Sequence, residues 1–516
     1  MTVRTRFAPS PTGFIHIGSV RTALFNWLFT RKHGGQYVLR IDDTDQQRNV
    51  AESLAPIFHG FRWLGLDWDE GAEVGGPNGP YYQSQKLPRY QDAIRQIVEK
   101  GLAYWDYANE AEMQAERQAA EQAKRPFRYS RRWMAQTAAD RARFESEGRT
   151  GVVRLKMERE GKCVFDDHIR GRVEVDWAQE ADHVIQRADG SALYNLASVV
   201  DDYDMKITHV IRSAEHLSNT PRQIFIARAL GYPLPEYAHV PTVAEPGSKN
   251  KLSKRKIAEY LKNPDFRKMY EHGERIAKSI GLPVAAETFN PVIVDFYERV
   301  GYLPEAILNY IVLLGWSLDD KTELFTLEEM TQAFSLERIN KAPASFDARK
   351  LSSFQERYMN LVPLDKKADM ARPYLQQAGL GTDKLVEVLQ AAADRIKVAG
   401  DILDYEGFFV SSEKLSYDEA AFDKRIRTPV EAPVLLKKFA GVLETLEPFD
   451  ASVIEKALQD FVQAEGIGHA QVIHALRIAV TGKAVGFGLF ESLAILGRDE
   501  CLTRIQRGLA RLSKAS

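Results

Sequence analysis

The sequence predicts an α/β protein in which a parallel sheet holds a ligand and a second, helical part follows. Residues 2–39 contain a strand, a loop, a helix and a second strand in that order, a βαβ unit that implies parallel strands. From about residue 333 onward the apolar residues have helical spacing. A chain of 516 residues is too long for one core, so we expect three to five domains.

The βαβ unit begins with residues 2–7, where polar and apolar residues alternate as in a strand. A helical pattern then starts near Val20 and stops at "HGG", residues 33–35. The next segment, "QYVLRIDDTD", predicts a second strand that runs into acidic residues. Ligands of such sheets gather at the carboxyl ends of the strands, which is where the loop of this unit lies.

The loop between the first strand and the helix, "FAPSPTGFIHIGS", has the residues of a phosphate site. Its prolines stiffen the chain, and Gly18 leaves room for a ligand at the helix entrance. Free N–H groups and the positive end of the helix dipole favour phosphate there, and His16 can donate a hydrogen bond. The motif alone is weak, because a lone His-x-Gly beside a helix is more often structural. The chain has neither the G-x-x-x-x-G-K-[ST] loop nor the G-x-G-x-x-G motif.

A second candidate segment, "GSKNKLSKRK" at Gly247–Lys256, is strongly basic. A basic loop of this kind can close over a triphosphate, although an isolated basic run is more often a solvated linker.

Composition limits the other possibilities. The net charge is −2, so any nucleic-acid surface must be local. Two cysteines, Cys163 and Cys501, cannot form a disulfide framework or a four-cysteine zinc site, so we expect no zinc. There is no apolar run of 18 residues and no secretion signal, so we expect a cytoplasmic protein without a membrane span.

"HIGS" and "KLSKR" together resemble the two signature motifs of class I aminoacyl-tRNA synthetases. Longer stretches are similar to glutamyl-tRNA synthetases of the bacterial type, among them "RFAPSPTGFIHIG", "GPYYQSQKLPRY", "VVDDYDMKITHVIR", "LPEAILNYIVLLGWS" and "LRIAVTGKAVGFGLFESLAILG". They occur in the family's order over nearly the whole chain.

The resemblance implies a Rossmann-like catalytic domain, an inserted α+β domain and an all-α anticodon-binding domain. The implied boundaries are 1–84 and 192–243 for the catalytic domain, 85–191 for the inserted acceptor-binding domain, 244–332 for a stem-contact module with the "KLSKR" loop, and 333–516 for the helical domain. Within 257–300 the chain is longer than is usual in the family. We assign no role to this extra segment, which is predicted as an amphipathic helix interrupted at Pro264 and Gly281.

The implied activity is that of a glutamate–tRNA ligase. L-Glutamate reacts with ATP to give glutamyl-adenylate, and the glutamyl group then passes to the 3′ end of tRNA(Glu). Mg²⁺ would arrive with ATP, and a monomer is expected by analogy.

The resemblance also assigns roles to individual residues. Catalysis falls to His16, Lys251, Ser253 and Lys254; ATP binding to His16, Gly18, Ser19, Glu215, Lys251, Leu252 and Lys254; and glutamate binding to Arg6, Ala8, Ser10, Asp42, Tyr194, Ser198 and Arg212. No metal ligand is assigned. Arg6 and Arg212 suit the side-chain carboxylate of glutamate, since guanidinium groups bind carboxylates in a two-pronged manner.

Three of these positions depart from the family pattern. Asp42 stands where Glu is usual, Ser198 replaces an Asn, and Ser19 replaces the second His of the first motif. The first two keep the chemical character of the side chain but shorten its reach, so the charge argument is unaffected.

RNA contacts can be assigned only by region. The Arg-rich run Arg125–Arg143 holds Tyr129 and Trp133 among cations, a composition that suits a single-stranded acceptor end, although a solvated helix face is equally compatible with any one Arg. Arg395 and Lys397 lie in the region expected to contact the anticodon.

Other functions explain less of the sequence than the ligase hypothesis does. A tRNA-independent adenylyltransferase or a truncated paralogue that modifies a tRNA base would not need the helical half. A degenerate synthetase that only binds RNA would not need to keep His16, Lys254, Arg6 and Arg212. A non-discriminating enzyme that also charges tRNA(Gln) remains open.

Overall fold

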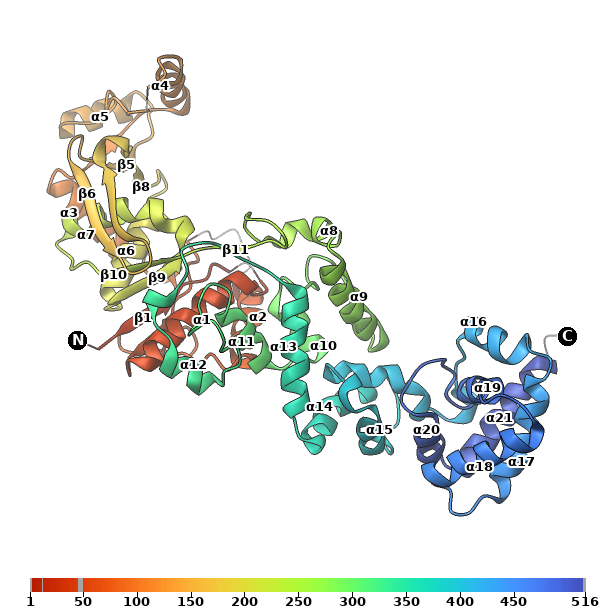
Figure 1. Ribbon diagram of the computed structural model, residues 1–516. Coiled ribbons are helices and arrows are strands. Elements are labelled where there is room, and N and C mark those ends of the chain that lie inside the picture. Colours follow the sequence, from red (N-terminus) through yellow and green to blue (C-terminus); the bar gives the residue numbers. More distant parts are fainter. Residues whose placement is uncertain (1, 12, 45–49, 126, 514–516) are drawn as a thin grey trace. The chain divides into compact units, whose positions relative to one another are not determined.

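The computed structural model describes residues 2–11, 13–44, 50–125 and 127–513, which form two compact units (Figure 1). The first unit comprises Met1–Arg267, Glu287–Asp295 and Pro304–Lys350, and the second comprises Lys268–Ala286, Phe296–Leu303 and Leu351–Ser516. No helix in the described part of the chain is long and apolar enough to span a membrane.

The predicted βαβ unit is confirmed at the start of the first unit. Strand β1 (Arg4–Phe7) leads through the loop to helix α1 (Ile17–Lys32), and strand β2 (Gln36–Leu39) returns parallel to β1. The register runs from Arg4 opposite Gln36 to Phe7 opposite Leu39. Helix α1 is buried on nearly all sides, so it is a central element of this unit.

A second sheet continues this layer in the order β7-β6-β10-β9. Its strands are β6 (Lys162–Asp167), β7 (Gly171–Asp176), β9 (His209–Ser213) and β10 (Glu236–Val240). β10 is parallel to both β6 and β9, and β6 and β7 form an antiparallel hairpin. The first sheet adjoins β9, because the Thr208 amide donates to the Arg4 carbonyl at 2.9 Å. The apolar core beneath the second sheet includes Leu196, Val200 and Ile224 of the covering helices.

Strand β3 (Glu70–Gly71) completes the first sheet, parallel to β2. Other elements of the first unit include α2 (Val50–Trp63), α3 (Leu87–Glu99), β4 (Ala103–Asp106), α4 (Glu110–Gln122), α5 (Ala138–Ser146), β5 (Val152–Leu155), β8 (Val184–Gln186), α6 (Tyr194–Asp204), the 3-10 helix η3 (Ala214–Asn219), α7 (Thr220–Leu230), β11 (Val243–Ala244), η4 (Lys254–Lys256), α8 (Ile257–Tyr260), α11 (Pro304–Val312), α12 (Leu327–Ala333) and β12 (Ala344–Ser345). Strands β4, β5 and β8 form a small antiparallel sheet.

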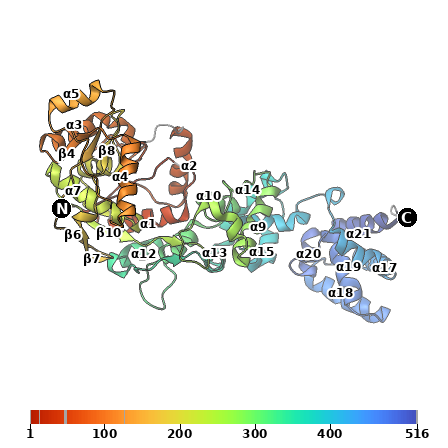
Figure 2. The ribbon, with the colours of Figure 1, turned by 90° about the horizontal axis from the view of Figure 1, so that it is seen from above.

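The second unit is helical in the part that the structure describes, as the apolar spacing predicts. Its helices are α14 (Leu364–Gln377), α15 (Leu385–Ala392), α16 (Glu419–Phe422), α17 (Ala432–Thr445), α18 (Ala451–Glu465), α19 (Ala470–Thr481), α20 (Leu489–Leu496) and α21 (Arg498–Ser513), and η7 (Ala399–Phe408) lies between α15 and α16. Figure 2 shows α17 to α21 gathered in one bundle.

Three further helices carry residues of both units: α9 (Pro264–Ser279), α10 (Val294–Val300) and α13 (Ala348–Leu361). The helix predicted in the extra segment is confirmed as α9, which begins at Pro264 and ends before Gly281. The part of α9 in the second unit packs closely, since a Cβ at Gly273 would meet Phe296 at 2.5 Å. His272 Nε2 contacts Asp401 Oδ1 at 2.5 Å, so this segment is also tied to η7.

Candidate active site

A cavity of about 600 Å³ lies in the first unit where β1, β2, β9, the amino end of α1 and the basic loop meet. Every predicted site residue except Ser198 lines it: Arg6, Ala8, Ser10, His16, Gly18, Ser19, Asp42, Tyr194, Arg212, Glu215, Lys251, Leu252, Ser253 and Lys254. Segments more than 200 residues apart in the chain therefore share one hollow. The roles of these residues remain predictions, but their convergence is a structural finding.

His16 caps the amino end of α1 and lines the cavity beside the basic loop. The Gly18 amide donates to His16 Nδ1 at 2.9 Å, which leaves the ring proton on Nε2. Burial, together with the charges of Lys254 and Lys251, lowers the pKa of His16 to about 4. The imidazole is therefore neutral at pH 7, and its one N–H, which interacts with the Leu252 backbone in this structure, is the group it could donate to an anionic ligand.

The basic loop closes this end of the cavity. Lys254 Nζ donates to the Phe14 carbonyl at 3.4 Å, and burial lowers the pKa of Lys254. Lys251 Nζ lies 2.8 Å from Glu215, so two residues that were both predicted to bind ATP pair with each other. Tyr260 secures the loop because its hydroxyl accepts from the Ser253 amide at 3.0 Å and donates to Glu245 at 3.1 Å.

Arg212 lies at the carboxyl end of β9 and is buried. Its Nε donates to His239 Nε2 at 3.1 Å, and its Nη2 donates to Thr220 Oγ1 at 2.9 Å. Its Nη1 is buried and has no hydrogen-bond partner in the described structure. An unpaired buried donor on a guanidinium is costly, so this atom suits an acceptor that a ligand brings into the cavity.

A buried pair behind Arg212 sets its orientation. His239 Nδ1 donates to Asp167 Oδ2 at 2.6 Å, and both side chains are fully buried. Because Nδ1 carries the proton, Nε2 is free to accept from Arg212. Sequence reasoning missed both residues. The stretches quoted for the family resemblance contain neither, and they meet only through the β6–β10 pairing.

Arg6 and Arg40 share one acidic partner at the other side of the cavity. Asp202 Oδ1 lies 3.0 Å from Arg6 Nε and 2.6 Å from Arg40 Nη1. Burial opposes ionisation of Asp202, but the two arginines outweigh it and lower the pKa of the carboxyl. This pairing holds Arg6 in place at the lining. Arg40 and Asp202 were also missed, although Arg40 occurs in the predicted strand segment "QYVLRIDDTD" and Asp202 in "VVDDYDMKITHVIR", which was quoted for the family resemblance.

The carboxylate of Asp42 already has a partner within the protein. Arg40 Nε donates to its Oδ1 at 2.7 Å, and burial still raises the pKa of Asp42 to about 6. Asp42, whose side chain is shorter than the usual Glu, thus lines the cavity while its carboxylate is paired with Arg40.

Two further residues predicted to bind glutamate, Tyr194 and Ser198, lie on α6, while Ala8 and Ser10 line the cavity from the loop after β1. Tyr194, the first residue of the helix, lines the cavity with its ring 5.7 Å from that of His216. Ser198 is one turn further along and buried, and it is not among the described lining residues. Its contact with a substrate stays a prediction.

One expectation for RNA binding is wrong. Tyr129 is buried and donates to Asp106, so its ring is not available to stack on a base. Trp133 is partly exposed, with the Arg149 guanidinium 3.6 Å from its ring centre. In the helical part, Lys397 pairs with Glu356, and Phe354 is buried in packing. Cys163 and Cys501 are both buried and free.

Comparisons with known proteins indicate one family over nearly the whole chain. A family model described as "tRNA synthetases class I (E and Q), catalytic domain" matches residues 2–276 and 289–353, and an anticodon-binding-domain model matches 366–509. A "Glutamate--tRNA ligase" of Moorella thermoacetica is 40% identical, covering 98% of this chain and 97% of the relative. Another "Glutamate--tRNA ligase", from Desulforudis audaxviator, is 38% identical and covers 99% of this chain and 96% of the relative. A crystal structure of a glutamate tRNA ligase from Elizabethkingia meningosepticum, in complex with its amino acid, has a TM-score of 0.82 at 30% identity and covers 99% of this chain and 100% of that one.

Proposed function

Since the chain belongs to the class I tRNA synthetases for glutamate and glutamine, we propose that it ligates L-glutamate to the 3′ end of tRNA(Glu) at the expense of ATP. The observation that carries the proposal is the unpaired Nη1 of Arg212, buried in the same cavity as His16 and the basic loop. One half of the hollow thus offers a guanidinium for an acidic side chain, and the other half offers donors for phosphate.

In the first step an oxygen of the glutamate α-carboxylate attacks the α-phosphorus of ATP. A phosphorus–oxygen bond forms, the bond to the bridging oxygen breaks, and pyrophosphate leaves with its electron pair. No protein nucleophile is needed, so the chain contributes position and charge. His16 Nε2–H and the Lys254 ammonium would meet the negative charge that grows on the phosphate oxygens.

Mg²⁺ belongs to this step as part of the ATP complex. The carboxylates in the described lining, Asp42 and Glu215, are engaged by Arg40 and Lys251, so they do not form a ready-made protein site for the ion. Its ligands would be the phosphates and water, as is common for this ion.

Selection of glutamate rests on charge. Arg212 Nη1 would donate to the side-chain carboxylate, with Arg6 beside it. Glutamine would leave a buried guanidinium without its counter-charge, and a site built for such a group rejects the analogue that lacks it by about 10⁴-fold.

In the second step a ribose hydroxyl of the terminal adenosine attacks the glutamyl carbonyl, and AMP leaves. We assign the acceptor end to the inserted segment 85–191 and the anticodon to the helical segment 333–516. We further propose that the enzyme works as a cytoplasmic monomer, which sedimentation at working concentrations would test.

ATP–pyrophosphate exchange tests the proposal. Exchange should require glutamate and tRNA together, and glutamine should not replace glutamate. No exchange under any condition would favour a degenerate RNA-binding protein, while exchange without tRNA would contradict the family analogy. Acylation of purified tRNA(Glu) and tRNA(Gln) separates a discriminating from a non-discriminating enzyme.

A further inference from the structure

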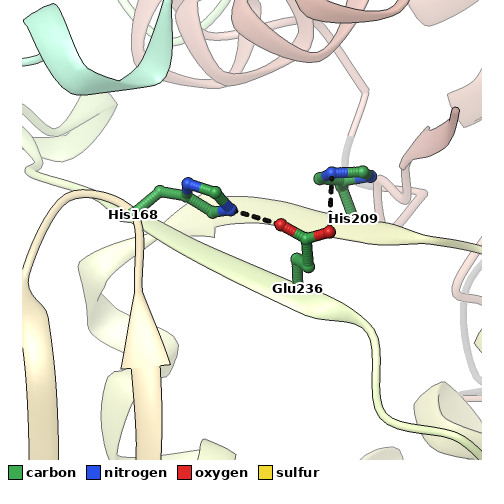
Figure 3. Close-up of side chains that lie close together, drawn as sticks. All are labelled: His168, His209 and Glu236. Carbon is green, nitrogen blue, oxygen red and sulfur yellow. Dashed lines mark hydrogen bonds and ion pairs between the residues drawn. The ribbon is translucent and has the colours of Figure 1, made fainter.

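Two histidines and a glutamate converge on the surface of the second sheet, away from the cavity (Figure 3). His168 follows β6, His209 is the first residue of β9, and Glu236 is the first residue of β10. Arg212 lies three residues further along β9, which in a strand is about 10 Å. None of the three lines the catalytic cavity, so the cluster is a separate feature.

The side chains are directed at one point. His168 Nε2 lies 2.6 Å from Glu236 Oε2, and His209 Nε2 lies 3.5 Å from Glu236 Oε1. One potential ligand atom from each residue lies within 4.8 Å of the others. Ligands of a tetrahedral zinc ion are about 3.3 Å apart, given metal–ligand distances of about 2.0–2.2 Å. Small side-chain rotations would therefore bring all three atoms onto one ion.

The backbone beneath the cluster is fixed by the sheet. Glu236 is in register with His209 across the parallel β9–β10 pair. The His168 amide donates to the Tyr237 carbonyl at 2.9 Å, which ties the turn after β6 to β10. The three ligand positions are thus set by hydrogen-bonded strands, which is the preorganisation that a metal site needs.

The ring nitrogen of His209 that does not face Glu236 has a polar partner. Its Nδ1 lies 2.8 Å from Thr208 Oγ1, and the same hydroxyl contacts the Arg4 carbonyl at 3.1 Å. If Thr208 donates to Arg4, its oxygen accepts the Nδ1 proton of His209 and leaves Nε2 as a metal-binding lone pair. Histidine ligands usually have such a partner, which fixes the ring and its tautomer.

We propose that His168, His209 and Glu236 bind one divalent transition-metal ion of the zinc type, with water in the open position. Two imidazoles and one carboxylate suit zinc and its neighbours, whereas magnesium and calcium prefer oxygen ligands alone. We expected no zinc because two cysteines cannot form a four-cysteine site. The ligand set proposed here contains no cysteine, so that reasoning does not apply to it. The ion would join the β6–β7 turn to β9 and β10, so its expected effect is to stabilise the fold.

Metal titration of the full chain tests this proposal. The protein is stripped with a chelator, freed of it, and titrated with Zn²⁺ in the absence of nucleotide. We expect one saturable site per chain and a higher thermal midpoint when it is filled. His168→Ala and His209→Ala should each weaken binding at least tenfold, and Glu236→Gln should weaken it less because the amide oxygen can still coordinate.

A matched control uses a second histidine–glutamate pair in the described part of the first unit, which is less exposed. His183 Nε2 lies 3.1 Å from Glu180, and no third ligand joins them in the described residues. His183→Ala should leave the stoichiometry unchanged. Co²⁺ gives a readout that does not depend on variants, because a bound four- or five-coordinate ion absorbs far more strongly than the aqueous ion. A spectrum like that of aqueous Co²⁺, or binding that survives loss of either ligand histidine, would overturn the proposal and leave an ordinary hydrogen-bonded cluster.

Discussion

The two ends of the cavity are both cationic, but they are built differently. At the glutamate end, Arg6 and Arg212 extend from strands and are only 5% exposed, with their orientation set by buried partners. At the phosphate end, the side chain of Lys251 is 59% exposed and lies on a loop. A fixed, desolvated guanidinium discriminates between a carboxylate and an amide, whereas a lysine on a loop can follow a ligand whose charge changes during reaction. Under the proposed function, selectivity is thus placed on the sheet and phosphate handling on the loop.

The largest effect should come from the glutamate end. Arg212→Ala removes the unpaired donor, so kcat/KM for glutamate in tRNA-dependent ATP–pyrophosphate exchange should fall about 10⁴-fold. Arg187→Ala, outside the cavity, is the control for loss of an arginine. Thermal melting shows whether the variant is folded. A folded Arg212→Ala enzyme with unchanged kcat/KM for glutamate would remove the distinction between the two ends.

A smaller effect is expected at the phosphate end. Lys254→Ala should lower kcat about 10²–10³-fold, with a modest change in KM for glutamate, because one charge-stabilising donor is lost. Lys256→Ala is a matched control two residues away, since Lys256 pairs with Glu245 and does not line the cavity. Equal losses in the two variants would mean that general loop charge, and not the Lys254 position, matters.

The support behind Arg212 should show a specific, weaker effect. In Asp167→Asn an amide that donates toward His239 Nδ1 would move the ring proton to Nε2, which could then no longer accept from Arg212. We expect KM for glutamate to rise about 10–100-fold, as for other residues that orient a ligand group, while KM for ATP stays unchanged. Asp166→Asn, at the exposed neighbouring position, is the control. A parallel rise in both KM values would indicate a purely structural role.

The smallest expected effect is on stability and depends on pH. The folded-state pKa of His16, about 4, is below its ordinary value of 6.5, so the folded state binds fewer protons. The contribution of neutral His16 to the free energy of unfolding is fully present above pH 6.5 and is lost as pH falls toward 4. About 2 kcal/mol is lost between pH 7 and 5. Denaturant unfolding of the ligand-free enzyme should show a shallower pH dependence in His16→Gln. If the free energy of unfolding depends on pH equally in His16→Gln and in the unaltered enzyme, His16 is not desolvated as the fold implies.

Local sequence was sufficient for much of the fold and for most of the site. Alternation and helical spacing predicted β1, α1 and β2, and the spacing near the carboxyl terminus predicted α21. The two motifs that carry His16 and Lys254 were visible as strings, because each motif is contiguous. Their chemistry follows from residue types that any helix entrance or basic loop would display.

Tertiary structure alone decided which charges are paired. Asp167 meets His239 across 72 residues, and Arg6 meets Asp202 across 196, through strand order and register that no local pattern specifies. The same holds for Tyr129, which looked available among cations but is buried against Asp106. The sequence determined which side chains could act. Only packing decided which of them are desolvated, since burial and partners, not residue type, set the orientation and the pKa of a buried group.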